Sequence, residues 1–306
     1  MSHIRAAAQQ GERPWQRRGT DYTGLNRQLA WADDGRPVRS VGGWTRDKLA
    51  LLAYYLPAFA KLCTDKVGGW YYLDGFAANG VNRTQEFPLA KGTALIGLSQ
   101  SPPPTKALLI ERNHDDVETL RARSIPFLTE TLVLEGDANE LIPKQLAFFD
   151  LPHLPGFCVL DPEGLELDWT TIQACAEHRR GRTPYELLIY FSTPGAARTG
   201  AVQAAGYVEK TEARLQRLFG NESWREVAQQ QGRRVLAPGE ASNLYLSMYE
   251  SQLRNLGYTT VLSRPSLRQD GVLVYHMVFA SANEAGASIM ASAFKRAYGS
   301  QVPLQF

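Results

Sequence analysis

Short apolar runs alternate with amphipathic stretches along the chain from residue 70 to residue 191. Apolar runs bounded by turn-forming residues are typical of strands that are buried on both faces. They lie at 70–73, 107–110, 132–134, 157–160 and 187–191. Between these runs, apolar positions spaced three and four apart predict helices at 93–100, 115–123, 139–149 and 169–180. This alternation predicts right-handed βαβ units and therefore a mainly parallel sheet.

Ahead of the first strand, the sequence predicts an arm and a long helix. Residues 1–43 are rich in Arg, Gln, Gly and Asp without a sustained period, which favours an extended N-terminal arm. Thr45 is an expected N-cap for a helix whose apolar positions keep the three-four spacing as far as Cys63. Because proline has no N–H, we expect a kink at Pro57.

After Pro194 the pattern becomes mostly helical and then returns to strands. Helical spacing covers 207–219, 223–230 and 240–256, and it is followed by strands at 258–262 and 272–281 and a helix at 283–298. The two strands flank a turn-rich segment, so we expect an antiparallel hairpin at the edge of the sheet. The predicted domains are an N-terminal arm (1–43), a core (44–194), a helical insertion (195–256) and C-terminal elements that complete the core (257–306).

The composition is that of an ordinary globular protein, with 44% hydrophobic and 21% charged residues. The net charge of +2 neither indicates nor excludes a nucleic-acid partner. We find no run of about eighteen apolar residues and no apolar leader, so we expect a cytoplasmic protein. Cys63, Cys158 and Cys175 are widely spaced and are predicted to be reduced core thiols. The histidines lack the spacing of metal ligands, and no metal site is expected.

Acidic residues follow four successive predicted strands. Asp74 opens the segment Asp74–Gly80, and the later strand ends carry Glu111, Asp137 and Asp161. In an open parallel sheet, ligands bind outside the carboxyl ends of the strands, where small residues let backbone amides approach the ligand. An Asp-Gly turn by itself is as often structural as functional. Four acids expected on one rim, however, favour a ligand site.

The type of ligand can be narrowed from the same segments. The glycine fingerprint of dinucleotide-binding proteins is absent, and Glu111 lies well beyond the distance of about 20 residues that such proteins use. A nucleoside ligand without a pyrophosphate fits better, and S-adenosylmethionine is such a ligand. The sequence therefore predicts an α/β protein with a Rossmann-like S-adenosylmethionine-binding core centred on Asp74–Gly80.

Several short motifs resemble those of a known family. In chain order they are YLPA (55–58), LDGFA (73–77), IE (110–111), GDAN (136–139), LDPEG (160–164), LIYFS (188–192), LFG (218–220) and YHMVFAS (275–281). Over about residues 44–298 the chain resembles the three-Cys-motif partner (TcmP) family. Members of this family are methyltransferase-like proteins found beside radical-SAM-type proteins that bear three cysteines.

The resemblance implies a Rossmann-like methyltransferase fold with S-adenosylmethionine as the cofactor. It implies that Asp74 and Gly80 lie near the methionine portion, Glu111 on the ribose and Asp137 near the adenine. The remaining cofactor-binding residues implied are Gly75, Phe76, Ala78 and Ala138. A three-Cys-motif radical-SAM-type protein is the implied partner, no membrane contact is implied, and the methyl acceptor is open between nucleic acid and a partner protein.

The chain departs from related sequences at two loops. Where relatives tend to read Phe-Ala-Gly-Pro-Gly, this chain has Ala78, whose Cβ would crowd the ligand or require a different turn. The loop Asp161–Gly164 is similar to the Asp-Pro-Pro-aromatic loop of enzymes that methylate exocyclic amino groups. Because Gly164 stands at the aromatic position, Phe191 or Trp169 would have to supply a stacking surface. Asp161 is the candidate catalytic residue, which would orient the acceptor atom, although Asp-Pro-x-Gly is also a good turn.

Other interpretations stay open. Ala78, Gly164 and the helical insertion are also compatible with a non-catalytic scaffold for the three-Cys partner. Phosphates would be bound if one face held the basic residues Lys48, Lys61, Arg179, Arg180, Arg182 and Arg198. Cations at a helix C-terminus also complement the helix dipole, which favours a structural role for Arg179. A nuclease is disfavoured because no acid-lysine cluster typical of a catalytic metal site is present.

Overall fold

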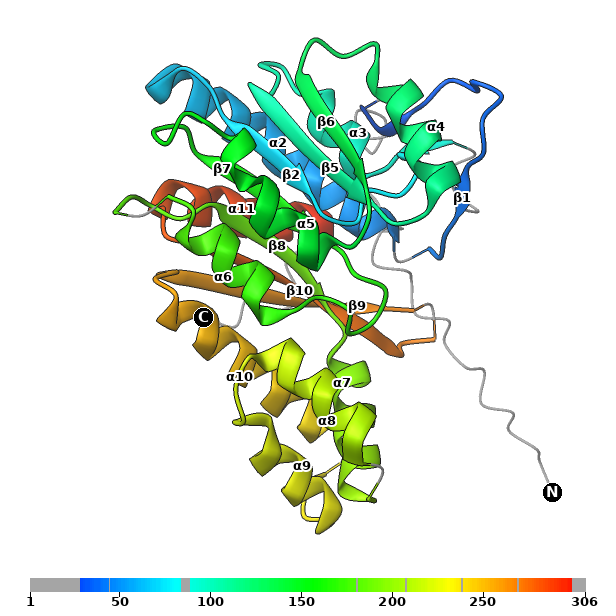
Figure 1. Ribbon diagram of the computed structural model, residues 1–306, viewed down its shortest axis with the longest axis vertical. Helices are drawn as coiled ribbons and strands as arrows, with labels where there is room; N and C mark the ends of the chain where they lie inside the picture. Colours follow the sequence, from blue (N-terminus) through cyan, green and yellow to red (C-terminus); the bar gives the residue numbers. More distant parts are fainter. Residues whose placement is uncertain are drawn as a thin grey trace, which may run out of the picture.

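A seven-stranded sheet forms the centre of the computed structural model, which describes residues 28–43, 45–83, 89–179, 181–206, 208–237, 239–268 and 270–298 (Figure 1). The expectations for residues 1–27 and Arg180 lie outside these ranges. The strands are β2 (Tyr71–Asp74), β5 (Lys106–Glu111), β6 (Glu130–Glu135), β7 (Gly156–Leu160), β8 (Glu186–Phe191), β9 (Thr260–Leu267) and β10 (Leu273–Ser281). All five predicted core strands are therefore present.

The order of the strands across the sheet is β6-β5-β2-β7-β8-β10-β9. The first five in this order run parallel, and β10 is antiparallel to both β8 and β9. Counted along the chain, this is the order 3-2-1-4-5-7-6, an open Rossmann-like α/β sheet. The predicted parallel sheet with an antiparallel C-terminal edge is confirmed. The order reverses between β2 and β7, where open sheets of this kind bind their ligands.

Helices cover both faces of the sheet (Figure 1). One face packs against α2 (Thr45–Val67), α3 (Thr93–Leu98), α4 (His114–Ser124) and α11 (Glu284–Tyr298). The other face packs against α5 (Ala138–Gln145), the short turn η2 (Leu146–Phe148) and α6 (Trp169–Glu177). Each face of the sheet has its own apolar core, and neighbouring residues of a strand point alternately into one and the other, as Tyr71 and Tyr72 do. Burial on both faces explains why these strands read as continuous apolar runs.

Four more helices gather beside the β8–β10 end of the sheet (Figure 1). They are α7 (Thr193–Ala204), α8 (Val208–Phe219), α9 (Trp224–Gly232) and α10 (Glu240–Asn255). Only α7 was not predicted, because its Ala- and Gly-rich sequence lacks large apolar residues at helical spacing. Pro194 stands in its first turn, where the missing N–H costs no hydrogen bond. Within the described residues, no helix combines the length and the apolar character needed to cross a membrane.

A small second sheet was also not predicted, because its strands are too short to show a period. It comprises β1 (Arg39–Ser40), β3 (Val81–Arg83) and β4 (Ala90–Lys91), with β1 parallel to β3. Pairing of β1 with β3 lays part of the predicted N-terminal arm beside the loop that follows β2. We call residues 34–42 the strap, because they cross the carboxyl ends of the main strands.

Candidate functional site

The strand ends bring the four predicted acids to one rim of the sheet. Asp74 is the last residue of β2 and Glu111 the last residue of β5. Asp161 directly follows β7, and Asp137 caps the N-terminus of α5 after β6. The parallel register pairs Asp74 with Leu109, two residues before Glu111. The predicted clustering of acids at the carboxyl edge is therefore present.

Two cavities that share part of their walls open along this rim. The first chamber, about 630 Å³, is lined by Gly75, Phe76, Glu111, Gly136, Ala138 and Asp161, among others. The second chamber, about 520 Å³, is lined by Lys48, Thr93, Asp161, Tyr190, Ser192 and Tyr275, among others. Both chambers are lined by Arg39, Phe76, Asp161 and Glu163. Gly80 and Ala78 line the second chamber as well.

The segment Asp74–Gly80 forms a tight loop between the chambers. A Cβ on Gly75 would lie 3.1 Å from side-chain carbons of both Ile142 and Leu160, so the loop packs against the core without room for a side chain. Ala78 adopts the left-handed conformation, with φ of +49°. This conformation strains a residue that carries a Cβ. The departure noted in the sequence is thus accommodated by backbone strain, and the turn keeps a conformation that suits glycine.

Asp74 is fully buried beneath this loop. Its Oδ1 accepts a hydrogen bond from the N–H of Phe76 at 3.2 Å, whereas its Oδ2 is buried and receives no hydrogen bond from the described residues. Burial raises the pKa of Asp74 to about 7, although a hydrogen bond from Thr93 acts in the opposite direction. A buried acceptor atom without a donor is costly unless a ligand or water supplies one.

Glu111 is held by three backbone amides at the edge of the first chamber. Its Oε2 accepts the N–H of Ala78 at 2.9 Å, and its Oε1 accepts the N–H groups of Arg112 and Asn113 at 2.7 and 2.8 Å. A carboxylate offers about four lone-pair sites. One site on Oε2 therefore stays available to a hydroxyl donor in the chamber.

Asp137 has a structural role in addition to the one implied by the resemblance. Its side chain caps α5 by accepting the N–H of Asn139 at 2.8 Å, and its other oxygen pairs with Arg112. The adjoining Gly136 and Ala138 line the first chamber, whereas Asp137 is not among the residues that line it. The N-terminus of α5 therefore faces this chamber mainly through its backbone.

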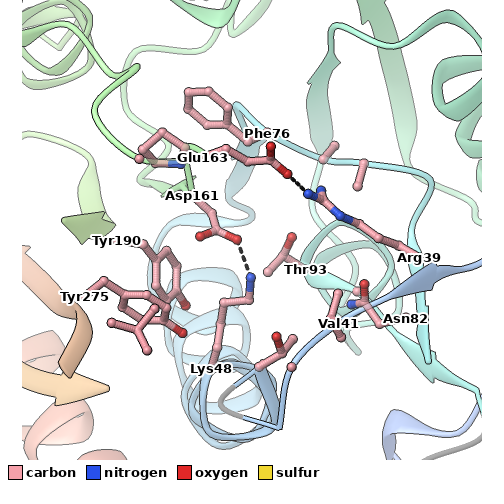
Figure 2. Close-up of a pocket in the computed structure, with 18 of the residues that line it drawn as sticks. Arg39, Val41, Lys48, Phe76, Asn82, Thr93, Asp161, Glu163, Tyr190 and Tyr275 are labelled. Carbon is pink, nitrogen blue, oxygen red and sulfur yellow. Dashed lines mark hydrogen bonds and ion pairs between the residues drawn. The ribbon is translucent and has the colours of Figure 1, made fainter. Parts of the chain in front are cut away.

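Lys48 is a residue of the site that sequence reasoning missed. It lies in the first turn of α2 and forms an ion pair with Asp161, with side chains 13% and 23% exposed (Figure 2). Its Nζ also lies 5.1 Å from the ring centroid of Tyr190. The sequence placed Lys48 only in a diffuse basic cluster, because no residue pattern near Lys48 predicts that α2 packs beside the end of β7.

The strap closes one side of both chambers. Its Arg39 pairs with Glu163 in the loop after β7, and Figure 2 shows this pair spanning the cleft above the Lys48–Asp161 pair. Ser40, Val41 and Gly42 of the strap also line the second chamber. The strap therefore contributes walls to a site that the sequence located only in the main strands.

Neither Phe191 nor Trp169, the two residues that the sequence left as candidates for a stacking surface, supplies one. Phe191 and Trp169 are buried on the opposite face of the sheet, where both pack against the ring of Tyr249. Neither lines a chamber. Because side chains alternate along a strand, Tyr190 is the residue of β8 that faces the second chamber, and Tyr275 of β10 lies beside it.

The proposed basic cluster does not share one face. Arg179 is buried and donates to the carbonyl oxygens of Pro152, His153 and Thr183, at 3.1, 3.0 and 2.7 Å. These contacts lie near the amino ends of β7 and β8, whereas Lys48 lies at the carboxyl ends. The structural interpretation of Arg179 is therefore correct. The predicted thiols Cys63, Cys158 and Cys175 are all buried and unpaired.

No family model matches the chain, and no curated protein matches its sequence. Solved structures similar to it include Trm1 from Pyrococcus horikoshii with S-adenosyl-L-methionine, at 14% identity and a TM-score of 0.38 over 87% of this chain and 62% of that chain. Protein LPL1258 from Legionella pneumophila is 10% identical, with a TM-score of 0.45 over 84% of this chain and 94% of that chain. The methyltransferase domain of bacterial CtHen1 is 11% identical, with a TM-score of 0.35 over 75% of this chain and 99% of that chain. At these values the similarity assigns no activity.

Proposed function

We propose that the chain is an S-adenosylmethionine-dependent methyltransferase that holds the nucleoside portion of its cofactor in the first chamber and the methyl acceptor in the second. The observation that carries this proposal is the placement of Glu111 and Asp161 in the walls of two joined cavities, with Asp74 buried beneath the loop between them. Phe76 lies in the wall that the cavities share.

The described residues fit this cofactor. A cavity of about 630 Å³ falls in the range of about 300–1,000 Å³ that small-molecule sites occupy. The available lone pair of Glu111 suits a ribose hydroxyl, and Gly136 and Ala138 line the proposed adenine side without long side chains of their own. Asp74 lies beneath the cavity walls, and its Oδ2, which receives no hydrogen bond from the described residues, is the acceptor that we propose for the ammonium of the methionine portion. Gly80 lines the second chamber. We therefore retain the roles implied for the cofactor-binding residues, with Asp137 acting mainly through the helix that it caps.

Asp161 is the proposed catalytic residue. When bound, S-adenosylmethionine supplies a methyl group that its sulfonium makes electrophilic. Asp161 lines both chambers, and Lys48 holds its Oδ2. The Oδ1 atom can then accept a hydrogen bond from a proton-bearing nitrogen or oxygen and orient it toward the first chamber. Orientation of this kind, together with acceptance of the proton, supplies most of what a methyl transfer requires.

We also propose that the chain belongs to the three-Cys-motif partner family, on the basis of the motifs in the sequence. Membership would give the methyltransferase a three-Cys-motif radical-SAM-type protein as partner, a cytoplasmic location, and nucleic acid or a partner protein as acceptor. Co-purification of the two proteins with and without S-adenosylhomocysteine tests the partnership. A non-catalytic scaffold would bind the partner equally well after Asp161→Asn and would transfer no methyl group.

Isothermal titration with S-adenosylhomocysteine tests the cofactor site. The wild type should bind, and Glu111→Ala should weaken binding about 10- to 100-fold, the equivalent of a hydrogen bond to a charged group. Glu118→Ala provides the matched control, because Glu118 is an exposed acid on α4 whose partner is Arg121. Thermal melting confirms that each variant is folded. Absence of binding by the wild type at millimolar ligand would refute the proposed function.

A further inference from the structure

The second chamber combines aromatic walls with one partly buried cation. Tyr190 and Tyr275 meet edge to face, with ring centroids 5.3 Å apart and an interplanar angle of 85°. In Figure 2 the carboxylate of Asp161 lies between these two rings and that of Phe76. The Lys48 side chain, only 13% exposed, places its charge between Asp161 and the Tyr190 ring. Such a chamber discriminates among acceptors by both charge and shape.

A protonated amine is a poor occupant of this chamber. The two carboxylates of the chamber are already paired, Asp161 with Lys48 and Glu163 with Arg39. A lysine side chain would therefore find no unpaired carboxylate and would bring a second ammonium beside Lys48, where limited exposure to water makes the repulsion stronger than at the surface. A neutral planar ring meets no such repulsion and packs favourably against aromatic side chains. Its N–H can donate to Oδ1 of Asp161. The chamber therefore favours a nucleobase over a lysine side chain.

Three arginines lie on the strap and on β3, the two segments that border the chamber. Arg39 lines the chamber, Arg36 lies in the strap ahead of β1, and Arg83 pairs in register with Ser40, which also lines the chamber. Arg36 and Arg83 are exposed, and neither forms an ion pair with a described residue. Arg39 pairs with Glu163, but the side chains are 42% and 73% exposed. An exposed pair contributes only about 0–1 kcal/mol, so a phosphate could replace Glu163 at Arg39.

Resting on the proposed methyltransferase function, we infer that the acceptor is a base of a nucleic acid, extruded into the second chamber while its flanking phosphates bind the arginines of the strap and β3. In the reaction the bond between the methyl carbon and sulfur breaks as a bond from that carbon to a base nitrogen forms. The proton of that nitrogen passes to Asp161 and then to water, which leaves neutral S-adenosylhomocysteine. Bases must leave the stack to enter such a chamber, and single strands enter most easily.

Fluorescence anisotropy with labelled single-stranded DNA and RNA of about 12 nucleotides tests the binding half of this inference. The wild type, saturated with S-adenosylhomocysteine, should bind. The double variant Arg36→Ala/Arg83→Ala should bind about tenfold more weakly, with a log–log salt slope smaller by roughly 1.4 because two phosphate contacts are lost. Arg233→Ala, an exposed arginine at the end of α9, should leave both quantities unchanged. Absence of binding by the wild type, or an equal loss in Arg233→Ala, would overturn the inference.

Transfer of a labelled methyl group tests the chemical half. The label should enter one type of base in the oligonucleotide, and the double variant should raise KM for the oligonucleotide while leaving KM for the free nucleoside unchanged. Label found only on a lysine-containing peptide or on a partner protein would overturn the inference and leave the proposed function standing. If S-adenosylhomocysteine does not bind, both fall.

Discussion

Arg123 and Asp34 form a bidentate pair that ties the strap to the loop after β2. The guanidinium of Arg123, whose side chain is 1% exposed, donates to both carboxylate oxygens of Asp34 at 2.8 and 2.9 Å. It also donates to the backbone carbonyl oxygen of Asn79 at 2.9 Å. Hydrogen bonds from Arg123 hold the pKa of Asp34 well below its usual range. One buried cation on α4 therefore positions both the strap and the loop that we propose binds the cofactor.

Asp34→Asn should loosen both segments. The substitution leaves Arg123 buried without a compensating charge, so we expect the free energy of unfolding to fall by about 1–3 kcal/mol in urea titrations at pH 7. Because the pKa of Asp34 is depressed in the folded state, this contribution is present above the ordinary carboxyl pKa of 3.8 and is lost as pH falls below it.

Affinity for S-adenosylhomocysteine should fall as well, because Asn79 belongs to the loop that we propose binds the cofactor. Asp33→Asn is the matched control, since among the described residues the Asp33 side chain accepts only a local N–H, that of Gly35. Unchanged affinity in a destabilised Asp34→Asn protein would show that the strap and the loop are independent.

Ala78→Gly should stabilise the protein. The left-handed φ of +49° strains the Cβ of alanine by about 1–2 kcal/mol, and glycine relieves this strain at a smaller cost in unfolded-state entropy. We expect a net gain of about 0.5–1 kcal/mol in the free energy of unfolding. The same substitution at Ala58, exposed on α2, should instead destabilise by about 1 kcal/mol. A loss of stability at both positions would contradict the strain at Ala78.

The strand-end acids could be predicted from the sequence because their positions follow from one regular feature. In a parallel sheet, the residue after each apolar run reaches the same edge, so Asp74, Glu111 and Asp161 were placed without any knowledge of side-chain contacts. The same reasoning failed for Phe191. A continuous apolar strand does not reveal which face each side chain takes, and the chamber is lined by the residue before it, Tyr190.

Contacts between distant parts of the chain could not be predicted. Lys48 and Asp161 are 113 residues apart, and Arg123 and Asp34 are 89 residues apart. Each pair depends on how a helix packs against the sheet or against the strap. No periodicity in the sequence carries that information. The sequence therefore located the residues of the proposed cofactor site and missed most of those that line the second chamber.

Stability should depend on pH through Glu186, at the start of β8. Burial raises the pKa of Glu186 to about 7, even though hydrogen bonds from Tyr55 and Ser281 lower it. The folded state therefore binds more protons than the unfolded state between about pH 4.5 and 7, and stability contributed by this group is lost as pH rises through that window.

Glu186→Gln should remove this dependence. We expect urea titrations at several pH values to show that the free energy of unfolding of the variant rises relative to that of the wild type between pH 4.5 and 7, by on the order of 2 kcal/mol. Glu177→Gln, at an exposed position at the end of α6, is the control, and its free energy of unfolding should differ from that of the wild type by the same amount at every pH. A constant difference between wild type and Glu186→Gln across the window would mean that Glu186 titrates normally.

Asp161→Asn should separate chemistry from cofactor binding. The amide keeps the shape of the side chain and can still accept a hydrogen bond, but it is a much weaker proton acceptor, so we expect the rate of methyl transfer to fall by about 10²- to 10⁴-fold. Asp161 is not the residue proposed to hold the ribose or the ammonium, so the affinity for S-adenosylhomocysteine should change little.

Lys48→Met gives the complementary measurement, because it removes the partner that fixes Oδ2 and leaves the carboxylate in place. If Lys48 acts only by positioning Asp161, its substitution should cost less than that of Asp161, and the double variant should be no slower than Asp161→Asn alone. A double variant slowed by the product of the two single effects would show that Lys48 contacts the acceptor directly.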